Sequence, residues 1–256
     1  MNLLVHILSV LILIGIAIAS EYCSSSLCSS GSHIACDHSG DFDSSCPSDA
    51  AMVEIDSSLK DAIIKYHNEK RNLVAGGEAA NHDAACRMAT MEWDDKLAYL
   101  ATLNVRQCKM AHDDCRNTDT FKYAGQNLAW RTFSSEPNYI ELANTSMDMW
   151  YDEVEHSNMV YINSYPENYD GPDIGHFTVM MNGPNNRLGC AAATYEADDP
   201  SKQTFLIACN YARTNVAGLA VYESCSSAGS SCTTGENSEY PNLCSTSEEY
   251  DVNDLS

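Results

Sequence analysis

Residues 187–211 read RLGCAAATYEADDPSKQTFLIACNY. The two ends of this stretch, RLGCAAATYE (187–196) and QTFLIACNY (203–211), are rich in β-favouring residues, and they flank DDPS, which has the composition of a turn. A hairpin centred on this turn places Cys190 opposite Cys209. The symmetry of the hairpin alone therefore predicts a cross-strand disulfide between these cysteines.

Three segments before the hairpin follow the period of an amphipathic helix. One is predicted to begin at Ser57 or Ser58, where Ser58-x-x-Asp61 resembles a capping box, and to end at Gly76-Gly77. The stripe of this helix consists of Leu59, Ile63, Tyr66, Lys70 and Leu73. A second helix is predicted from about Asp94 and a third over about 138–155.

The segment HFTVMM (176–181) is also rich in β-favouring residues, which predicts a further strand. Helices followed by antiparallel strands, without an internal repeat, indicate one α/β or α+β domain with a sandwich-like architecture. The chain is 44% hydrophobic, enough to build a core for such a domain.

The beginning of the chain points to an oxidising compartment. LLVHILSVLILIGIAIA (3–19) is an uncharged apolar run that ends in Ala17-Ile18-Ala19, a pattern that signal peptidase accepts. We therefore predict a signal peptide over 1–19 and a secreted mature chain without a membrane span. All 12 cysteines follow this run, so six disulfides are expected.

Composition divides the rest of the chain into three parts. Residues 20–55 carry four cysteines among Ser, Gly and Asp, which predicts a disulfide-tied N-terminal extension. Residues 56–223 form the globular domain. Residues 224–256 are acidic, contain three cysteines and are expected to form a mostly irregular, partly disulfide-tied tail.

The net charge of −22 disfavours nucleic acid and anionic membrane surfaces as partners, because both are bound by Lys and Arg. The acidity favours cationic partners. Asn144-Thr145-Ser146 is an N-glycosylation sequon, so a secreted chain would carry an exposed attachment point at Asn144.

Several polar residues next to apolar segments are candidates for a site, although each also has a structural interpretation. His176 in the predicted strand is typical of a hydrogen-bonded structural residue, and Glu153 of a solvated helix face. His112 stands three residues from Cys115, as in some zinc sites. In an oxidising compartment such a thiol is paired, which removes it as a ligand.

Taken together, these segments resemble the CAP superfamily of cysteine-rich secretory, antigen 5 and pathogenesis-related proteins. The resemblance covers about 57–223, and the extension before it looks like that of insect antigen 5 venom allergens. The residues that carry it are HNEKRN (67–72), MEWDDKLA (91–98), QCKMAHDDCR (107–116), YAGQNLAW (123–130), MWYDEV (149–154), GHFTVMMN (175–182), LGCAAATY (188–195) and ACNYA (208–212).

The resemblance implies an α-β-α sandwich with a cleft where two histidines and two acidic residues meet. The matching residues are His112, His176 and Glu153, with Gln126 where many relatives have Glu. In some members the two imidazoles hold a divalent cation such as zinc. An amide at position 126 makes the site less anionic, so metal binding here should be weaker or depend wholly on the histidine pair.

The resemblance also implies disulfide pairs, and it agrees with the hairpin on Cys190–Cys209. The other implied pairs are Cys23–Cys36, Cys28–Cys115 and Cys46–Cys108. The remaining cysteines, expected to form two bridges within the tail or between tail and core, are Cys86, Cys225, Cys232 and Cys244. Val179 and Asn182 replace the family's usual Gln and Trp, and ACNYARTNV lacks the common Gly-Pro, which we expect to alter the cleft rim and a loop.

Three interpretations of function follow. The first is a secreted non-enzymatic effector that binds an extracellular protein, lipid or sterol, and an IgE-binding allergen if the source is a biting or stinging insect. The second is a zinc-dependent hydrolase or protease, with His112 and His176 as ligands and Glu153 as general base. In the third, the four residues form a buried polar network that only fixes the cleft walls. The first is favoured because no nucleophile paired with a base is evident.

Overall fold

The computed structural model describes residues 22–255, so the predicted signal peptide lies outside the described residues. The predicted hairpin forms from β4 (Arg187–Glu196) and β5 (Gln203–Tyr211), with Cys190 opposite Cys209. β3 (Gly125–Phe133) pairs antiparallel with β5. The sheet is completed by β1 (Ala51–Val53) and β2 (Glu92–Trp93), which both pair with β4.

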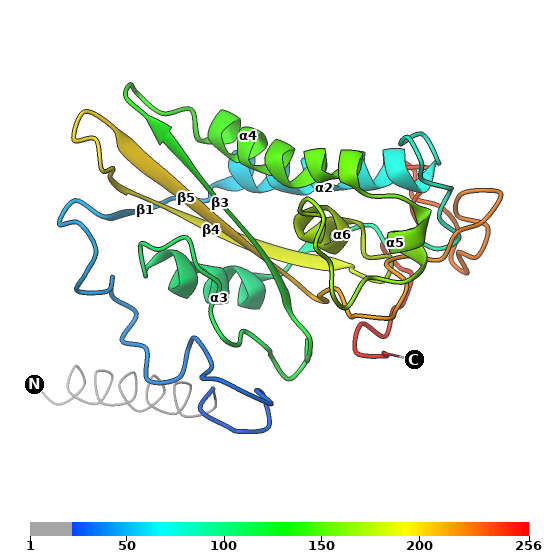
Figure 1. The fold of residues 1–256 in the computed structure, drawn as a ribbon, viewed down its shortest axis with the longest axis horizontal. Helices are drawn as coiled ribbons and strands as arrows, with labels where there is room; N and C mark the ends of the chain where they lie inside the picture. Colours follow the sequence, from blue (N-terminus) through cyan, green and yellow to red (C-terminus); the bar gives the residue numbers. More distant parts are fainter. Residues whose placement is uncertain (1–21, 256) are drawn as a thin grey trace, which may run out of the picture.

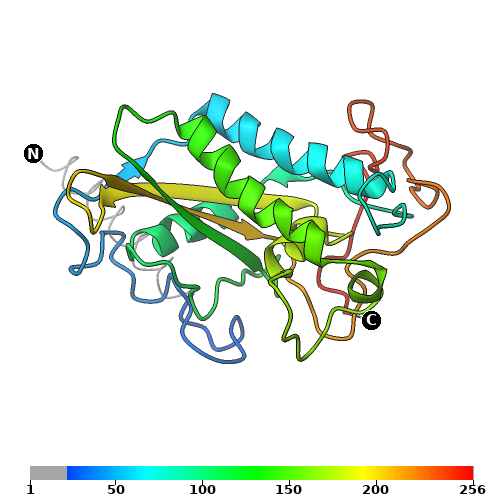
Figure 2. The same cartoon turned by 45° about the horizontal axis from the view of Figure 1, so that its top comes forward.

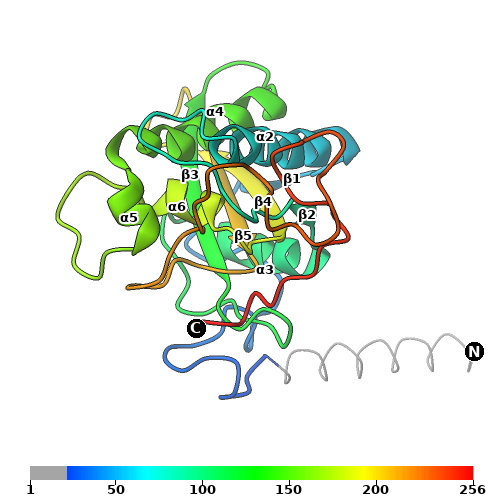
Figure 3. The ribbon, with the colours of Figure 1, turned by 90° about the vertical axis from the view of Figure 1, so that its right-hand side faces the viewer.

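Helices cover both faces of this sheet (Figure 1). α2 (Ser57–Ala75) and α4 (Tyr139–Asp152) lie side by side on one face, where α6 (Gly175–Met181) also packs (Figure 2). α3 (Asp95–Val105) covers the other face, and the three layers are seen end on in Figure 3. After α4 the chain forms the 3₁₀ helix η1 (Glu153–His156) and α5 (Met159–Asn163). The predicted α-β-α sandwich is confirmed.

Alternating side chains of the hairpin supply two separate cores. Ala192, Phe205 and Ile207 face the layer of α2 and α4, while Ala193 and Leu206 face α3. Because both faces are covered, most residues of β4 and β5 are buried. At Gly189 the sheet and α3 approach closely, since a Cβ there would lie 2.2 Å from the backbone nitrogen of Ala98 in α3.

The predicted strand at 176–181 is wrong, because residues Gly175–Met181 form α6. Phe177 through Met181 are all buried, so this short apolar run shows neither the helical nor the strand period. The first predicted helix spans the expected residues, but its N-cap is Asp56, whose side chain accepts from the Leu59 amide. The capping box at Ser58 does not form.

Disulfides fasten both ends of the described chain to the domain. The extension is tied to itself by Cys23–Cys36 and to the loop after α3 by Cys28–Cys115 and Cys46–Cys108. In the tail, Cys86–Cys225 joins the core and Cys232–Cys244 closes a short loop. Cys190–Cys209 crosses the hairpin. No helix among residues 22–255 is long and apolar enough to cross a membrane.

Asn144 does not lie at an exposed site as expected. It is half-buried in α4, between Ala143 and Ser146, which both face the core. Ser146 is fully buried and donates its hydroxyl to the Leu142 carbonyl oxygen at 2.8 Å. Its glycosylation stays a prediction.

Candidate functional site

The four residues singled out from the sequence, called here the tetrad (His112, Gln126, Glu153 and His176), come from four separate elements. His112 lies in the loop after α3, and Gln126 is the second residue of β3. Glu153 begins η1, and His176 lies in the first turn of α6. The disulfides of Cys108 and Cys115 bracket His112, so the N-terminal extension braces this loop.

The structure brings the tetrad together as two hydrogen-bonded pairs. In the first, His112 Nδ1 lies 2.8 Å from Gln126 Oε1. An amide oxygen only accepts, so Nδ1 carries the proton and Nε2 keeps its lone pair. The Gln126 amide is oriented by its nitrogen, which donates to Asp113 Oδ2 at 2.8 Å and to Asn210 Oδ1 at 2.9 Å.

In the second pair, His176 Nδ1 lies 2.5 Å from Glu153 Oε1. The other carboxylate oxygen, Oε2, accepts from the backbone amide of Phe177 at 3.0 Å. The His176 ring is stacked on Trp150, with ring centroids 6.3 Å apart. The Glu153 side chain is only 11% exposed. Its two oxygens accept from the His176 ring and from the Phe177 amide, so this carboxylate holds the first turn of α6 and the His176 imidazole in place.

Electrostatics keep His112 neutral near pH 7. Desolvation of the ring lowers its pKa below the ordinary value and outweighs the hydrogen bond to Gln126, which acts in the opposite direction. Asn127, the residue after Gln126, donates its side-chain amide to the His176 carbonyl oxygen at 3.1 Å, so the two histidine pairs are neighbours. Two imidazoles with their Nδ1 positions occupied can therefore each offer Nε2 to a ligand.

The tetrad does not bring three ligand atoms of His, Cys, Asp or Glu residues within 4.8 Å of one another. Among residues 22–255, the only group of three His, Cys, Asp or Glu whose ligand atoms lie within 4.8 Å of one another is Cys23, Cys36 and Asp37. Cys23 and Cys36 form a disulfide, which removes both thiolates. Any cation at the tetrad would depend on the two imidazoles.

One expectation about the site is corrected. Val179 and Asn182 do not form a rim, since they are 5% and 2% exposed. Val179 is a residue of α6 that packs into the core, and the Asn182 carbonyl oxygen accepts from Arg71 at 2.9 Å. Both residues therefore belong to the packed interior and not to the surface of a cleft.

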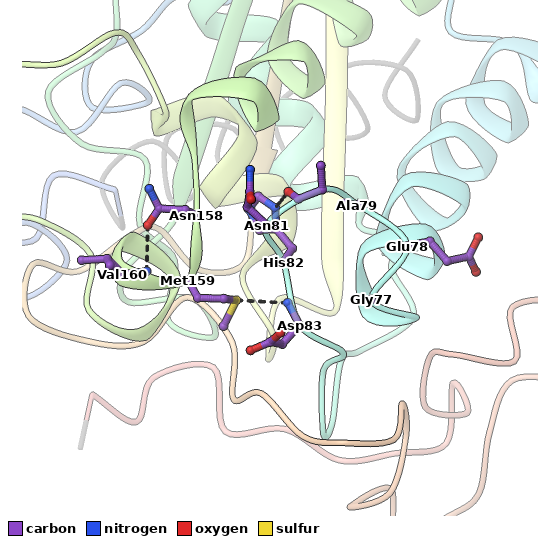
Figure 4. A pocket seen from close by; sticks show the side chains of 10 residues that line it. Gly77, Glu78, Ala79, Asn81, His82, Asp83, Asn158, Met159 and Val160 are labelled. Atoms are coloured by element: carbon purple, nitrogen blue, oxygen red, sulfur yellow. Dashed lines mark hydrogen bonds between the residues drawn. The ribbon is translucent and has the colours of Figure 1, made fainter.

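A histidine that the sequence did not single out, His82, contacts the residue that follows His176. His82 contacts Phe177 edge to face, with ring centroids 5.3 Å apart, and its Nε2 lies 3.2 Å from Ser157 Oγ. Figure 4 shows His82 at a hollow of about 670 Å³ between residues 77–83 and 158–160. The Ser157 hydroxyl links the loop of His82 to the loop after η1. Because Ser157 is only 2% exposed, this hydroxyl is not accessible to a substrate.

Residues 64–211 match the sequence model of CAP, described as the cysteine-rich secretory protein family. The chain is 39% identical to Venom allergen-1 of Aedes aegypti over 249 residues, which cover 96% of this chain and 95% of that protein. It is also 39% identical to the antigen 5 like allergen Cul n 1 of Culicoides nubeculosus, covering 72% and 89% of the two chains.

Its fold is similar to the crystal structure of NaASP2 with Zn²⁺, with a TM-score of 0.63 and 21% identity. The match covers 78% of this chain and 100% of that one.

Proposed function

The chain belongs to the CAP family, and on this basis we propose that it acts as a secreted, non-enzymatic extracellular binding protein of the antigen 5 type. The observation that carries the proposal is the hydrogen bonding of the tetrad. Gln126 and Glu153 are both used to orient imidazoles, and neither is left free to move protons. The site is built to present two ring nitrogens.

The hydrolase alternative finds no support in this geometry. It needs Glu153 as a free general base, yet both of its oxygens already accept hydrogen bonds. Gln126 is an amide and cannot replace it. The Ser157–His82 contact resembles a nucleophile with its base, but the serine is buried.

The donor set fits a divalent cation such as zinc, held by Nε2 of His112 and Nε2 of His176. Each ring donates from Nδ1 to an oxygen, the arrangement that orients histidine ligands in metal sites. A solved neighbour is described as containing Zn²⁺, which supports the same proposal. A bound cation would give the site a positive charge for an anionic group of a partner.

The partner we propose is an extracellular protein, lipid or sterol. The venom allergen and antigen 5 names of the relatives support a role outside the producing cell, and IgE recognition if the source is a biting or stinging insect. Six disulfides among the described residues suit such an environment.

Zinc calorimetry tests the site with three proteins: wild type, His112→Ala/His176→Ala, and the control His156→Ala, which removes an exposed histidine of η1. We expect wild type and control to bind one zinc ion and the double variant to bind none. If the double variant still shows heat of zinc binding, the assignment of His112 and His176 as the ligands is wrong.

The same proteins, with and without zinc, are then tested against protein and ester substrates. We expect no turnover above background in any of them. Zinc-dependent turnover that disappears only in the double variant would overturn the non-enzymatic proposal in favour of the hydrolase. Binding of sterol- or lipid-containing vesicles by wild type and double variant then shows whether the partner uses the tetrad.

A further inference from the structure

A hollow lies where the sheet extends beyond α3. Figure 1 shows the β4–β5 hairpin reaching past the end of this helix. On this face α3 covers Leu128 of β3, and the next residue with the same orientation is Trp130, which is 53% exposed. The uncovered end of the face borders a hollow of about 850 Å³. Its size suits a small organic ligand.

The floor of the hollow is a cross-strand row of side chains. Thr132 of β3 is paired with Thr204 of β5, which is paired with Tyr195 of β4. Together with Trp130 these residues line the hollow. The floor therefore has two aromatic rings and two hydroxyl-bearing side chains, fixed by the sheet.

The N-terminal extension supplies the opposite wall, through Pro47 and the Cys46–Cys108 bridge. It is fastened to the hairpin by Asp49, which accepts from the Glu196 amide at 3.1 Å and from Gln203 Nε2 at 3.0 Å. Because disulfide, latch and sheet are all in place, the hollow is formed before any ligand arrives.

The uncompensated charge at the hollow is negative. Lys202 is paired with Asp199 at 3.3 Å. The Arg131 guanidinium donates to the Thr145 carbonyl oxygen of α4, so it is directed to the helices on the other face of the sheet. Within the described part of the chain, the carboxylates of Glu196 and Asp198 have no ion-pair partner. The net charge of −22 would attract cations to this surface as well.

We propose that this hollow binds a small organic cation with an apolar body, such as a protonated or quaternary amine. Trp130 and Tyr195 take the apolar body and a face of the cationic group, and Glu196 and Asp198 neutralise its charge. A neutral ligand such as a sugar could stack on Trp130 but would gain nothing from the two free carboxylates.

Three probes with the same phenylethyl body test the charge preference by calorimetry at pH 7: 2-phenylethylammonium, neutral 2-phenylethanol and anionic 3-phenylpropanoate. We expect the cation to bind at least about tenfold more tightly than the alcohol, and the anion not to bind. Equal binding of cation and alcohol, preference for the anion, or no binding of the cation overturns the proposal.

Variants locate the binding. Trp130→Ala, or Glu196→Gln with Asp198→Asn, should weaken the cation at least about fivefold, since all three positions lie outside the packed cores. The matched controls are Tyr123→Ala, an exposed aromatic elsewhere, and Glu54→Gln with Asp61→Asn, an exposed acidic pair. Equal losses in the controls would show non-specific attraction and overturn the site. Retained binding by His112→Ala/His176→Ala separates this site from the tetrad.

Discussion

The amide nitrogen of Gln126 donates to the buried carboxylate of Asp113 across 2.8 Å. The same Asp113 oxygen accepts from Asn104, and the other lies 2.6 Å from Arg116 Nε. Gln126 thus joins the tetrad to a buried charged network without adding a second anion to it.

Gln126→Glu should destabilise the protein in a pH-dependent manner. The ionised carboxylate of this variant would face Asp113 Oδ2 and Asn210 Oδ1 where the wild-type amide donates, so we expect a loss of about 2 kcal/mol in the free energy of unfolding at pH 8. Repulsion raises the pKa of the new carboxyl in the folded state, so the deficit should shrink as the pH falls toward 5. Chemical denaturation at both pH values measures it. An equal deficit at both contradicts the argument.

Much of the fold could be predicted where one signal dominates. The hairpin of Cys190 and Cys209 follows from its symmetry, and the first helix from its period and the Gly76-Gly77 stop. β3 could not be predicted, because its first five residues are all buried and show no alternation. β1 and β2 are too short to carry a pattern, and only their pairing with β4 defines them.

The polar residues of the site were found only through their resemblance to a family. Nothing in the sequence around Glu153 or His176 shows that they are 2.5 Å apart, since that contact depends on where η1 and α6 pack. The same limit applies to α2. Its predicted stripe includes Tyr66 and Lys70, whereas the buried face includes His67 and Arg71, polar residues whose partners lie elsewhere in the chain.

His67 should make the protein sensitive to acid. It is fully buried, its Nδ1 lies 2.8 Å from the Ile63 carbonyl oxygen and its Nε2 2.9 Å from the Tyr211 hydroxyl. Burial lowers its pKa from 6.5 to about 4. Between pH 6.5 and pH 4 the unfolded chain takes up a proton that the folded chain does not bind. The free energy of unfolding therefore decreases as the pH falls, by up to about 1.4 kcal/mol per pH unit.

The variant His67→Phe isolates this effect. It should be less stable at pH 7, since Tyr211 loses its acceptor, but its free energy of unfolding should fall less steeply between pH 6.5 and 4. Denaturant titrations across this range compare the slopes. If both proteins have the same slope, His67 does not cause the acid sensitivity.

Gly189→Ala should disrupt the contact between β4 and α3. A Cβ at Gly189 would lie 2.4 Å from the Asp94 carbonyl oxygen as well as against Ala98, and backbone atoms cannot rotate away. We expect a loss of about 3 kcal/mol, measured by thermal or chemical unfolding. Gly175→Ala is the control, because its nearest contact would be Tyr165 Oη at 3.7 Å. Similar losses in both variants would refute the packing argument.

The tail should be released when Glu248 is neutralised. This side chain is fully buried and lies 2.6 Å from Arg87 Nε, and its carboxylate accepts from the backbone amides of Thr233 and Thr234. Burial alone would raise its pKa, but the hydrogen bonds from Thr234, Thr233 and Arg87 hold the pKa at about 2. The carboxylate therefore fixes the irregular tail to the domain at a second point, besides the Cys86–Cys225 disulfide.

In Glu248→Gln the new amide NH₂ would face the N–H groups of Thr233 and Thr234, and Arg87 would lose its counter-ion. We therefore expect the free energy of unfolding to decrease by about 3 kcal/mol. Proteolysis within 226–256 should be faster. The exposed neighbour in Glu249→Gln makes the same chemical change and should have little effect. The folded pKa lies below the ordinary 4.5, so the stability contributed by Glu248 is present above pH 4.5 and is lost as the pH falls toward 2. The difference in the free energy of unfolding between wild type and Glu248→Gln should therefore become smaller as the pH falls over that range. A gap that stays constant would mean that the side chain acts by packing and not by its charge.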